Sequence, residues 1–214
     1  MFADRKEAGQ KLAEKLLRYR GKDAVVLALP RGGVVVGYEI AKALKLPLDI
    51  VVTRKIGHPN NPEYAIGAVD ENGALLLNEA ECRLIEKEWL KNEVEKQKNE
   101  ASRRIRVYRG GREPSEIKGK TAIITDDGIA TGLSMRLAIK VVKEGKPERI
   151  IVAVPVAPYE ITNELKNNVD ELIVLLPPKE FGGAVGAHYK SFEQVPDAEV
   201  VRLLEASAAE NEMV

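Results

Sequence analysis

The chain has 214 residues, and its 33 Lys plus Arg balance 33 Asp plus Glu, so its formal net charge is zero. This length suffices for one sizeable core, and the balance lacks the basic excess usual in nucleic-acid binders. A single Cys excludes an internal disulfide, and the longest apolar runs fall far short of the roughly 20 residues that span a bilayer, so we expect a cytoplasmic protein with no membrane or nucleic-acid partner.

Short apolar runs alternate with helical patterns along the chain. The patterns predict helices at 5–19, 34–44, 79–105, 132–142, 161–166 and 196–206. They predict strands at 24–29, 48–53, 66–69, 75–77, 121–125, 150–156 and 172–176. The Asn72-Gly73 pair predicts a hairpin between 66–69 and 75–77. The runs at 121–125 and 150–156 are apolar on both faces, which is typical of a parallel sheet covered by helices. We therefore expect a doubly wound α/β fold, with ligand sites at the carboxyl ends of its strands.

The segment 121–134 combines a buried strand, two carboxylates and a helix start. The strand ends at Asp126 and Asp127, and a short glycine-containing loop leads into the next helix. Backbone N–H groups at such a junction suit a phosphate, and the hydroxyls of Thr131 and Ser134 add donors. The carboxylates would repel that phosphate, so they should face sugar hydroxyls or a metal shell. A ribose 5-phosphate fits both halves, and an ordinary turn before a capped helix is the alternative.

This segment resembles the PRPP-binding signature of type I phosphoribosyltransferases, which has four apolar residues, two acidic residues, and a Thr-Gly pair followed by a small or hydroxyl residue. The resemblance implies that fold for one domain at 1–214, with a flexible-loop insertion at 57–120 and a small hood with the C-terminal helix at 177–214. It assigns the ribose hydroxyls to Asp126 and Asp127 as catalytic residues. It assigns the 5-phosphate and its surroundings to Gly128, Ile129, Ala130, Thr131, Gly132 and Ser134.

Ala130 departs from one branch of the family. In the hypoxanthine–guanine branch, the residue before the Thr-Gly pair is acidic and can serve as a base toward the purine. Ala130 therefore resembles the adenine and orotate branches, although nothing else in the sequence identifies either base. The acceptor is expected to be a nitrogenous base of unassigned identity.

Two further loops follow predicted strands. The resemblance implies that Arg31, Gly32 and Gly33 bind the pyrophosphate of PRPP, where paired glycines allow close backbone approach. A plain strand-to-helix turn is the alternative. Arg54 and Lys55 come after the next strand, where the family often places a basic residue. Adjacent residues of an extended chain point opposite ways, so one of the two is expected to face the site, and Lys55 is preferred.

The insertion and the hood complete the expected site. Arg109, in the stretch that returns to the central strand, could meet the diphosphate when a lid closes, and a solvated linker is the alternative. Phe181 and Tyr189 occupy the position of the family's hood and could stack on a planar base. Packing of these aromatic residues on the core is the alternative.

Segments along nearly the whole chain resemble a bacterial and archaeal group of predicted phosphoribosyltransferases without an assigned substrate. The resemblance implies transfer of the 5-phosphoribosyl group from PRPP to a small-molecule acceptor, with pyrophosphate as the other product. It also implies Mg²⁺, held mainly through PRPP and water rather than by protein ligands, and a homodimer. The alternatives are a non-catalytic protein that senses PRPP or nucleotides, and a vestigial site on an assembly protein.

Overall fold

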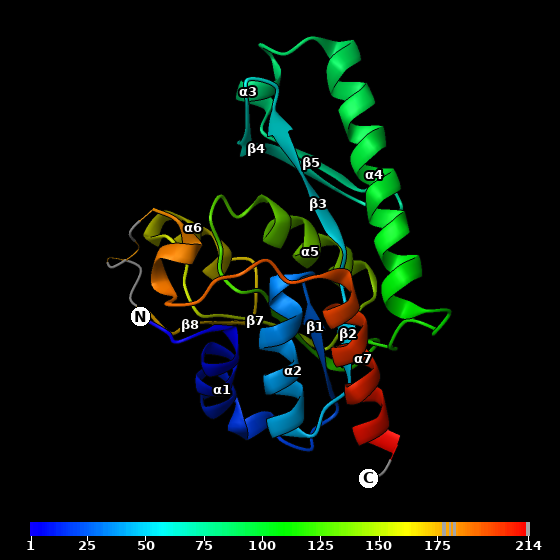
Figure 1. Ribbon diagram of the computed structural model, residues 1–214, viewed down its shortest axis with the longest axis vertical. Helices are drawn as coiled ribbons and strands as arrows, with labels where there is room; N and C mark the ends of the chain where they lie inside the picture. The colour runs from blue at the N-terminus through cyan, green and yellow to red at the C-terminus, as the bar shows by residue number, and fades with distance from the viewer. Residues whose placement is uncertain (177–178, 180, 182, 213–214) are drawn as a thin grey trace.

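The computed structural model describes residues 1–176, 179, 181 and 183–212. Figure 1 shows a body built on one sheet, with a hairpin and a long helix extending from it. The five strands of the body are parallel and lie in the order β2-β1-β6-β7-β8. Their bounds are β1 Ala24–Ala28, β2 Leu48–Ile50, β6 Thr121–Thr125, β7 Arg149–Val154 and β8 Glu171–Val174.

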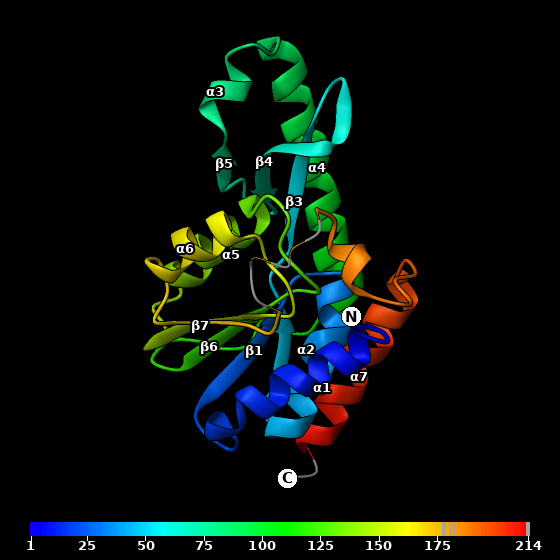
Figure 2. The same cartoon turned by 90° about the vertical axis from the view of Figure 1, so that its left-hand side faces the viewer.

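Helices cover both faces of this sheet (Figure 2). One face packs against α5 (Leu133–Glu144) and α6 (Tyr159–Lys166), and the other against α1 (Arg5–Lys15) and α2 (Gly32–Leu44). The strands β1 and β6 are buried along their whole length, because apolar side chains on both faces lose contact with water only between two helical layers. The doubly wound α/β fold predicted from these runs is confirmed.

The part that extends from the body consists of three antiparallel strands and two helices, which we call the hairpin–helix unit (residues 53–109). Its elements are β3 Thr53–His58, β4 Asn61–Asp70, β5 Leu75–Leu77, α3 Glu79–Cys82 and α4 Lys87–Arg109. The hairpin predicted around Asn72-Gly73 is confirmed as β4 and β5, where Gly73 has a left-handed φ of 91°. The helix α4 packs along β3 and β4, so much of the expected flexible loop is regular structure.

Several predicted elements differ in extent from those of the structure, and two of these differences change the fold around the site. The strand predicted at 48–53 ends at Ile50, and Thr53 begins β3 of the second sheet. The helix predicted at 79–105 is interrupted between α3 and α4. Ile85 lies in this interruption and packs with Ile56 and Ile66 of the hairpin. The chain turns at this point, and the turn allows the Ile85 side chain to be buried. The spacing of apolar residues along a single helix does not predict such a turn.

The C-terminal part returns to the body. A short 3-10 helix, η3 (Val185–His188), leads to Tyr189, which forms a β-bridge with Phe2 near the N-terminus. The last helix, α7 (Asp197–Glu212), packs on α2 and α4. Residues 177–178, 180 and 182 of the predicted hood lie outside the described residues. None of the helices within the described part of the chain has the length and apolar character needed to cross a membrane.

Candidate functional site

The carboxyl ends of β1 and β6 bring two of the predicted loops together. The backbone N–H of Leu29 donates to the carbonyl oxygen of Thr125 at 2.9 Å. The glycine loop that follows β1 and the acidic loop that follows β6 therefore leave the sheet side by side. Neighbouring parallel strands end at the same edge, which is why the ligand loops of such sheets meet there.

A crevice of about 250 Å³ lies above the acidic loop, and we call it the loop crevice. Its lining includes most of the residues that the signature predicts for the ribose phosphate, together with one predicted lysine. The lining residues are Lys55, Glu63, Ala65, Asp126, Gly128, Ile129, Ala130, Thr131, Gly132, Ser134 and Met135. The structure therefore gathers Asp126, the loop and Lys55 around one space of suitable size for a small polar group.

The start of α5 forms one side of this crevice. Gly132 precedes the helix with a left-handed φ of 79°, and no side chain of the described residues caps the first turn. An added Cβ at Gly132 would lie 2.8 Å from Ile161 Cγ2, so glycine suits this position both in conformation and in space. The uncapped N–H groups at a helix start favour an anion.

Asp126 is the acidic residue that lines the crevice. Its Oδ1 accepts a hydrogen bond from the backbone N–H of Asp127 at 2.8 Å. Burial, and then the negative charge of Asp127, raise the pKa of Asp126 well above its usual range. The ionised form of Asp126 is therefore disfavoured in this structure, and a donor or cation that approaches its carboxyl would stabilise that form.

Asp127 has a different environment. Its Oδ2 accepts from Arg5 Nε at 2.7 Å, and both side chains are largely buried. Its backbone oxygen accepts from the hydroxyl of Tyr189 at 2.6 Å. Burial raises the pKa of Asp127, and the guanidinium of Arg5 opposes that rise. Asp127 is not part of the crevice lining, although its carboxyl still interacts with that of Asp126.

Gly32 and Gly33, predicted as a loop, begin α2 and pack directly against both acidic residues. A Cβ added to Gly32 would lie 1.9 Å from Asp127 Oδ2, and one added to Gly33 would lie 2.9 Å from Asp126 Cα. Only glycine leaves room for this approach. Arg31, which precedes them, forms an ion pair with Asp197 at 3.6 Å, and the Pro30–Arg31 peptide bond is cis.

Arg54 and Lys55 point to different surroundings, as expected of neighbours in a strand. Lys55 lines the loop crevice, and its Nζ contacts Glu63 Oε2 at 2.7 Å. Arg54 instead donates from Nε to Gln97 Oε1 of α4 at 3.0 Å. Burial lowers the pKa of Arg54, and the positive charge of Arg104 lowers it further.

Three other predicted residues lie away from the loop crevice in this structure. Arg109 donates to Asp49 and to the carbonyl oxygen of Ile50 at the outer edge of the sheet, and its contact with the diphosphate on closure stays a prediction. Tyr189 is buried against Phe2 and Phe192, an arrangement that corresponds to the packing alternative. Phe181 stacks on His188, with ring centroids 5.4 Å apart.

Two residues that the structure places at the site had no predicted role. Arg5 begins α1, more than one hundred residues before Asp127, and its guanidinium also lies 3.8 Å from the ring centroid of Phe192. Glu63 faces the crevice from β4. A basic residue in the first turn of a polar helix and a glutamate after a proline are both ordinary surface patterns, so only tertiary contacts identify them.

Comparisons with known proteins agree with the fold. A family model described as a phosphoribosyl transferase domain matches residues 3–190. A Thermus thermophilus protein of known crystal structure is 43% identical, with a TM-score of 0.77 over 95% of this chain and 97% of that one.

A Mycobacterium tuberculosis H37Rv protein, itself only provisionally named a phosphoribosyl transferase, is 40% identical over 207 residues, and the same match occurs in strain CDC 1551. The match covers 96% of this chain but 46% of the mycobacterial protein, so the chain spans about half the length of that relative. The extent of the family match and these identities together show that the chain belongs to the phosphoribosyl transferase domain family.

Proposed function

We propose that this protein is a phosphoribosyltransferase that binds PRPP in the loop crevice and transfers its 5-phosphoribosyl group to a nitrogenous acceptor, with pyrophosphate as the other product. The observation that carries the proposal is the polarity of the crevice. A carboxylate, Asp126, lines it together with the uncapped start of α5 and the loop 128–132. The hydroxyl groups of a ribose 5-phosphate would meet the carboxylate, and its anionic phosphate would meet the loop and the helix start.

The 5-phosphate would anchor the ligand by the loop N–H groups and the hydroxyls of Thr131 and Ser134. Asp126 Oδ2 would accept from the ribose hydroxyls. Binding energy gained at these remote groups would orient C1 for reaction. As the bond between C1 and the diphosphate lengthens, positive charge develops on the sugar, and the carboxylate of Asp126 would stabilise it.

Asp127 would act on the site through its neighbours. Its ion pair with Arg5 lies against Gly32, so it would hold the glycine loop at the distance where its backbone can receive the diphosphate. Arg31 and Lys55 would supply positive charge to that group. Arg31 already contacts Asp197, and it would exchange this partner for the ligand.

A divalent cation fits this proposal only through the ligand. The described residues contain no group of three or more His, Cys, Asp or Glu side chains that could hold a metal. We expect Mg²⁺ to be held mainly by oxygens of PRPP and by water, where it would neutralise the leaving diphosphate. A homodimer and a cytoplasmic location stay predictions.

Titration calorimetry with PRPP tests binding, and pyrophosphate release with a panel of bases tests turnover. We expect Asp126→Asn to weaken PRPP binding by about tenfold or more, because it removes a charged acceptor. Asp23→Asn is the matched control, since Asp23 is an exposed carboxylate just before β1, at the opposite end of the strands. Equal PRPP affinity in both variants would contradict the proposal.

A PRPP sensor without turnover is the second candidate. Ala130 is the observation that favours it, because this exposed position in the crevice carries no acid or base. Tight PRPP binding without pyrophosphate release for any acceptor would favour the sensor over the enzyme.

A further inference from the structure

A pocket of about 490 Å³ lies between α5 and α6, and Leu76 of β5 also lines it. We call it the α5–α6 pocket. Figure 2 shows the two helices side by side on one face of the sheet, with β5 next to α5. Its volume falls within the ~300–1,000 Å³ that small-molecule sites occupy. Among the described residues, none lines both this pocket and the loop crevice, so it is a separate space.

The floor of the α5–α6 pocket is apolar and belongs to the packed core. Ile139 of α5 and Leu165 of α6 line the pocket and are both buried in the cluster that covers the sheet. Leu76 is partly buried and packs against the other side of α5. These side chains are held by their neighbours in the core, so the floor is formed before any ligand arrives. It offers contact to the apolar part of a ligand.

Charged side chains surround this floor. Arg136, Lys140, Lys143 and Glu144 are three or four residues apart and share one face of α5, and Glu164 faces them from α6. Arg136 forms an ion pair with Glu164, so these two charges compensate each other. Glu144 lies one turn from Lys140 and offsets its charge. Three cations and two carboxylates thus line the pocket, which leaves one positive charge in excess.

Lys143 carries this excess charge. Its side chain is exposed, and it forms no ion pair or hydrogen bond within the described part of the chain. A single unpaired cation beside an apolar floor favours a ligand with one negative charge. A second negative charge on the ligand would meet Glu144 or Glu164, so a dianion is disfavoured.

Arg136 offers a further donor. In the part of the chain that the structure describes, its Nε is buried and has no hydrogen-bond partner. The same guanidinium donates from Nη2 to Glu164, and this ion pair holds it in place. A buried N–H without an acceptor is unfavourable. Because Arg136 lines the pocket, an anionic group bound there would supply the missing acceptor.

We propose that the α5–α6 pocket is an effector site for a small amphipathic anion. The apolar part of the ligand would lie on Ile139 and Leu165, and its single anionic group would meet Arg136 and Lys143. This site is separate from the transfer reaction, and its occupant is neither PRPP nor the acceptor.

Arg136 also connects the pocket with the loop crevice. Its backbone N–H donates to the carbonyl oxygen of Gly132 at 2.9 Å, and Gly132 lines the crevice. A Cβ added to Gly132 would lie 3.6 Å from Arg136 Nε. An anion at Arg136 adds negative charge behind the start of α5, where the 5-phosphate of PRPP would bind. The occupied pocket should therefore lower PRPP affinity, and PRPP should lower the affinity of the pocket for its ligand by the same factor.

The probe is 8-anilinonaphthalene-1-sulfonate, which has an apolar ring system and one sulfonate, and whose emission rises in apolar surroundings. N-phenyl-1-naphthylamine is its matched control, because it has the same rings without the sulfonate. We expect saturable binding of one sulfonate probe per chain and binding of the neutral compound at least tenfold weaker. Calorimetry with PRPP should give an affinity about fivefold lower when the probe saturates the protein, a change at the low end of known coupling.

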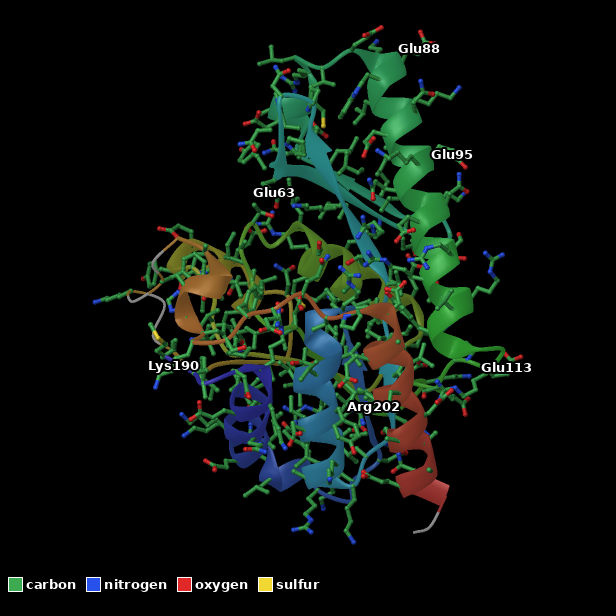
Figure 3. The ribbon with its side chains drawn as sticks, in the orientation of Figure 1. Glu63, Glu88, Glu95, Glu113, Lys190 and Arg202 are labelled. Carbon is green, nitrogen blue, oxygen red and sulfur yellow. The ribbon has the colours of Figure 1, made fainter. Side chains whose placement is uncertain are left out.

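Two substitutions locate the binding. Lys143→Glu turns the excess cation into an excess carboxylate, so it should raise the dissociation constant of the sulfonate probe about tenfold or more. Arg136→Met should raise it as well and remove the effect on PRPP affinity. Lys190→Glu is the matched control, since Lys190 is exposed and lies beside the N-terminal residues (Figure 3). Lys143 is exposed, so its replacement keeps the test valid even if Arg136→Met fails to fold.

Each other outcome overturns the inference. Equal binding of the sulfonate and the neutral compound, or equal loss in Lys143→Glu and Lys190→Glu, would mean that the pocket does not select an anion. Complete displacement of the probe by ribose 5-phosphate would place it in the loop crevice. Binding in the pocket without a change in PRPP affinity would remove the effector role. If PRPP does not bind at all, the proposed function fails, whereas the probe titrations still test the pocket.

Discussion

Two regions of the molecule differ in how far their charged side chains are exposed to water. They are the loops at the edge of the parallel sheet and the hairpin–helix unit above them. At the sheet edge, Asp126 and Asp127 are mostly buried, and Gly32 and Gly33 lie within van der Waals contact of them. In the hairpin–helix unit, Lys55, Glu63 and Lys96 are exposed and line an open cavity. The comparison teaches that close contacts of the main chain determine the geometry of the first region. In the second region, exposed side chains that can be substituted at little cost determine the shape of the cavity.

The largest effect on stability is expected at Arg5. Arg5→Met removes the partner of a largely buried carboxylate, which costs about 3 kcal/mol when one half of a buried pair is deleted. The cost should depend on pH. A carboxylate whose folded pKa is raised loses stability as pH rises through that pKa, and loss of Arg5 raises the pKa of Asp127 further. Arg5→Met should therefore cost less at about pH 4 than at about pH 8.

Urea unfolding of Arg5→Met, Asp127→Asn and the double variant at both pH values measures this coupling. The double variant should lose less than the sum of the single variants, since no unpaired charge remains. An Arg5→Met cost that does not change with pH would contradict the ion pair's role.

Gly33→Ala tests the close approach of the two loops. The added Cβ would meet Asp126 Cα at 2.9 Å and the Thr125 carbonyl oxygen at 3.1 Å. Because Ala gains about 1 kcal/mol over Gly in helix propensity and overpacking costs up to about 3 kcal/mol, we expect a net loss of about 2 kcal/mol and weaker PRPP binding.

Gly119→Ala is the control for this variant. It has open space around its Cβ but a φ of 71°, so it should lose about 1 kcal/mol from backbone conformation alone and leave PRPP binding unchanged. A Gly33→Ala protein with unchanged stability and PRPP affinity would mean that the loops can separate at little cost.

Tyr108→Phe tests the joint between the two regions. Tyr108 of α4 donates to Asp197 Oδ1 of α7 at 2.6 Å, and this bond is the main reason that the pKa of Asp197 is lowered. Burial raises the pKa of Tyr108 to about 12. Loss of a hydrogen bond to a charged group should cost about 1.5 kcal/mol.

The pH dependence of Tyr108→Phe has a different cause from that of Arg5→Met. Asp197 stabilises the fold while ionised, and that contribution disappears as pH falls through its lowered pKa. The cost of Tyr108→Phe, measured by urea unfolding, should therefore shrink toward acid. Tyr64→Phe is the control, because its phenol is exposed and bonds Glu81 at the surface, and an equal loss in both variants would contradict the joint.

The smallest effect on stability is expected for Glu63→Gln. The Lys55–Glu63 pair is exposed, so its loss should leave the thermal midpoint unchanged within error, as should the control Glu95→Gln on the outer side of α4 (Figure 3). PRPP affinity should rise slightly for Glu63→Gln, which removes a negative charge from the loop crevice and frees Lys55, and should not change for Glu95→Gln. A drop in thermal midpoint confined to Glu63→Gln would mean that the pair supports the hairpin.

The sequence was sufficient where neighbours in the chain decide the structure. One example is the segment 121–134, which contains the apolar run of β6, the Asp-Asp pair and the loop 128–132. Within a few residues these define a strand, a turn and a helix start, and all lie where predicted. The adjacency of Arg54 and Lys55 in a strand implied that only one of them faces the loop crevice, although both line the cavity between the hairpin and α4. The residue preferred for the site, Lys55, is the one that lines the loop crevice.

Tertiary structure decided what depends on residues far apart in the chain. The sequence by itself determined the doubly wound sheet and the crevice loop, because hydrophobic periodicity and turn chemistry are local. Only the fold decided that Asp127 belongs with Arg5, that Arg109 pairs with Asp49, and that Tyr189 packs inside. A buried charge or hydroxyl must find a partner wherever the packed chain supplies one, and local sequence does not encode that partner.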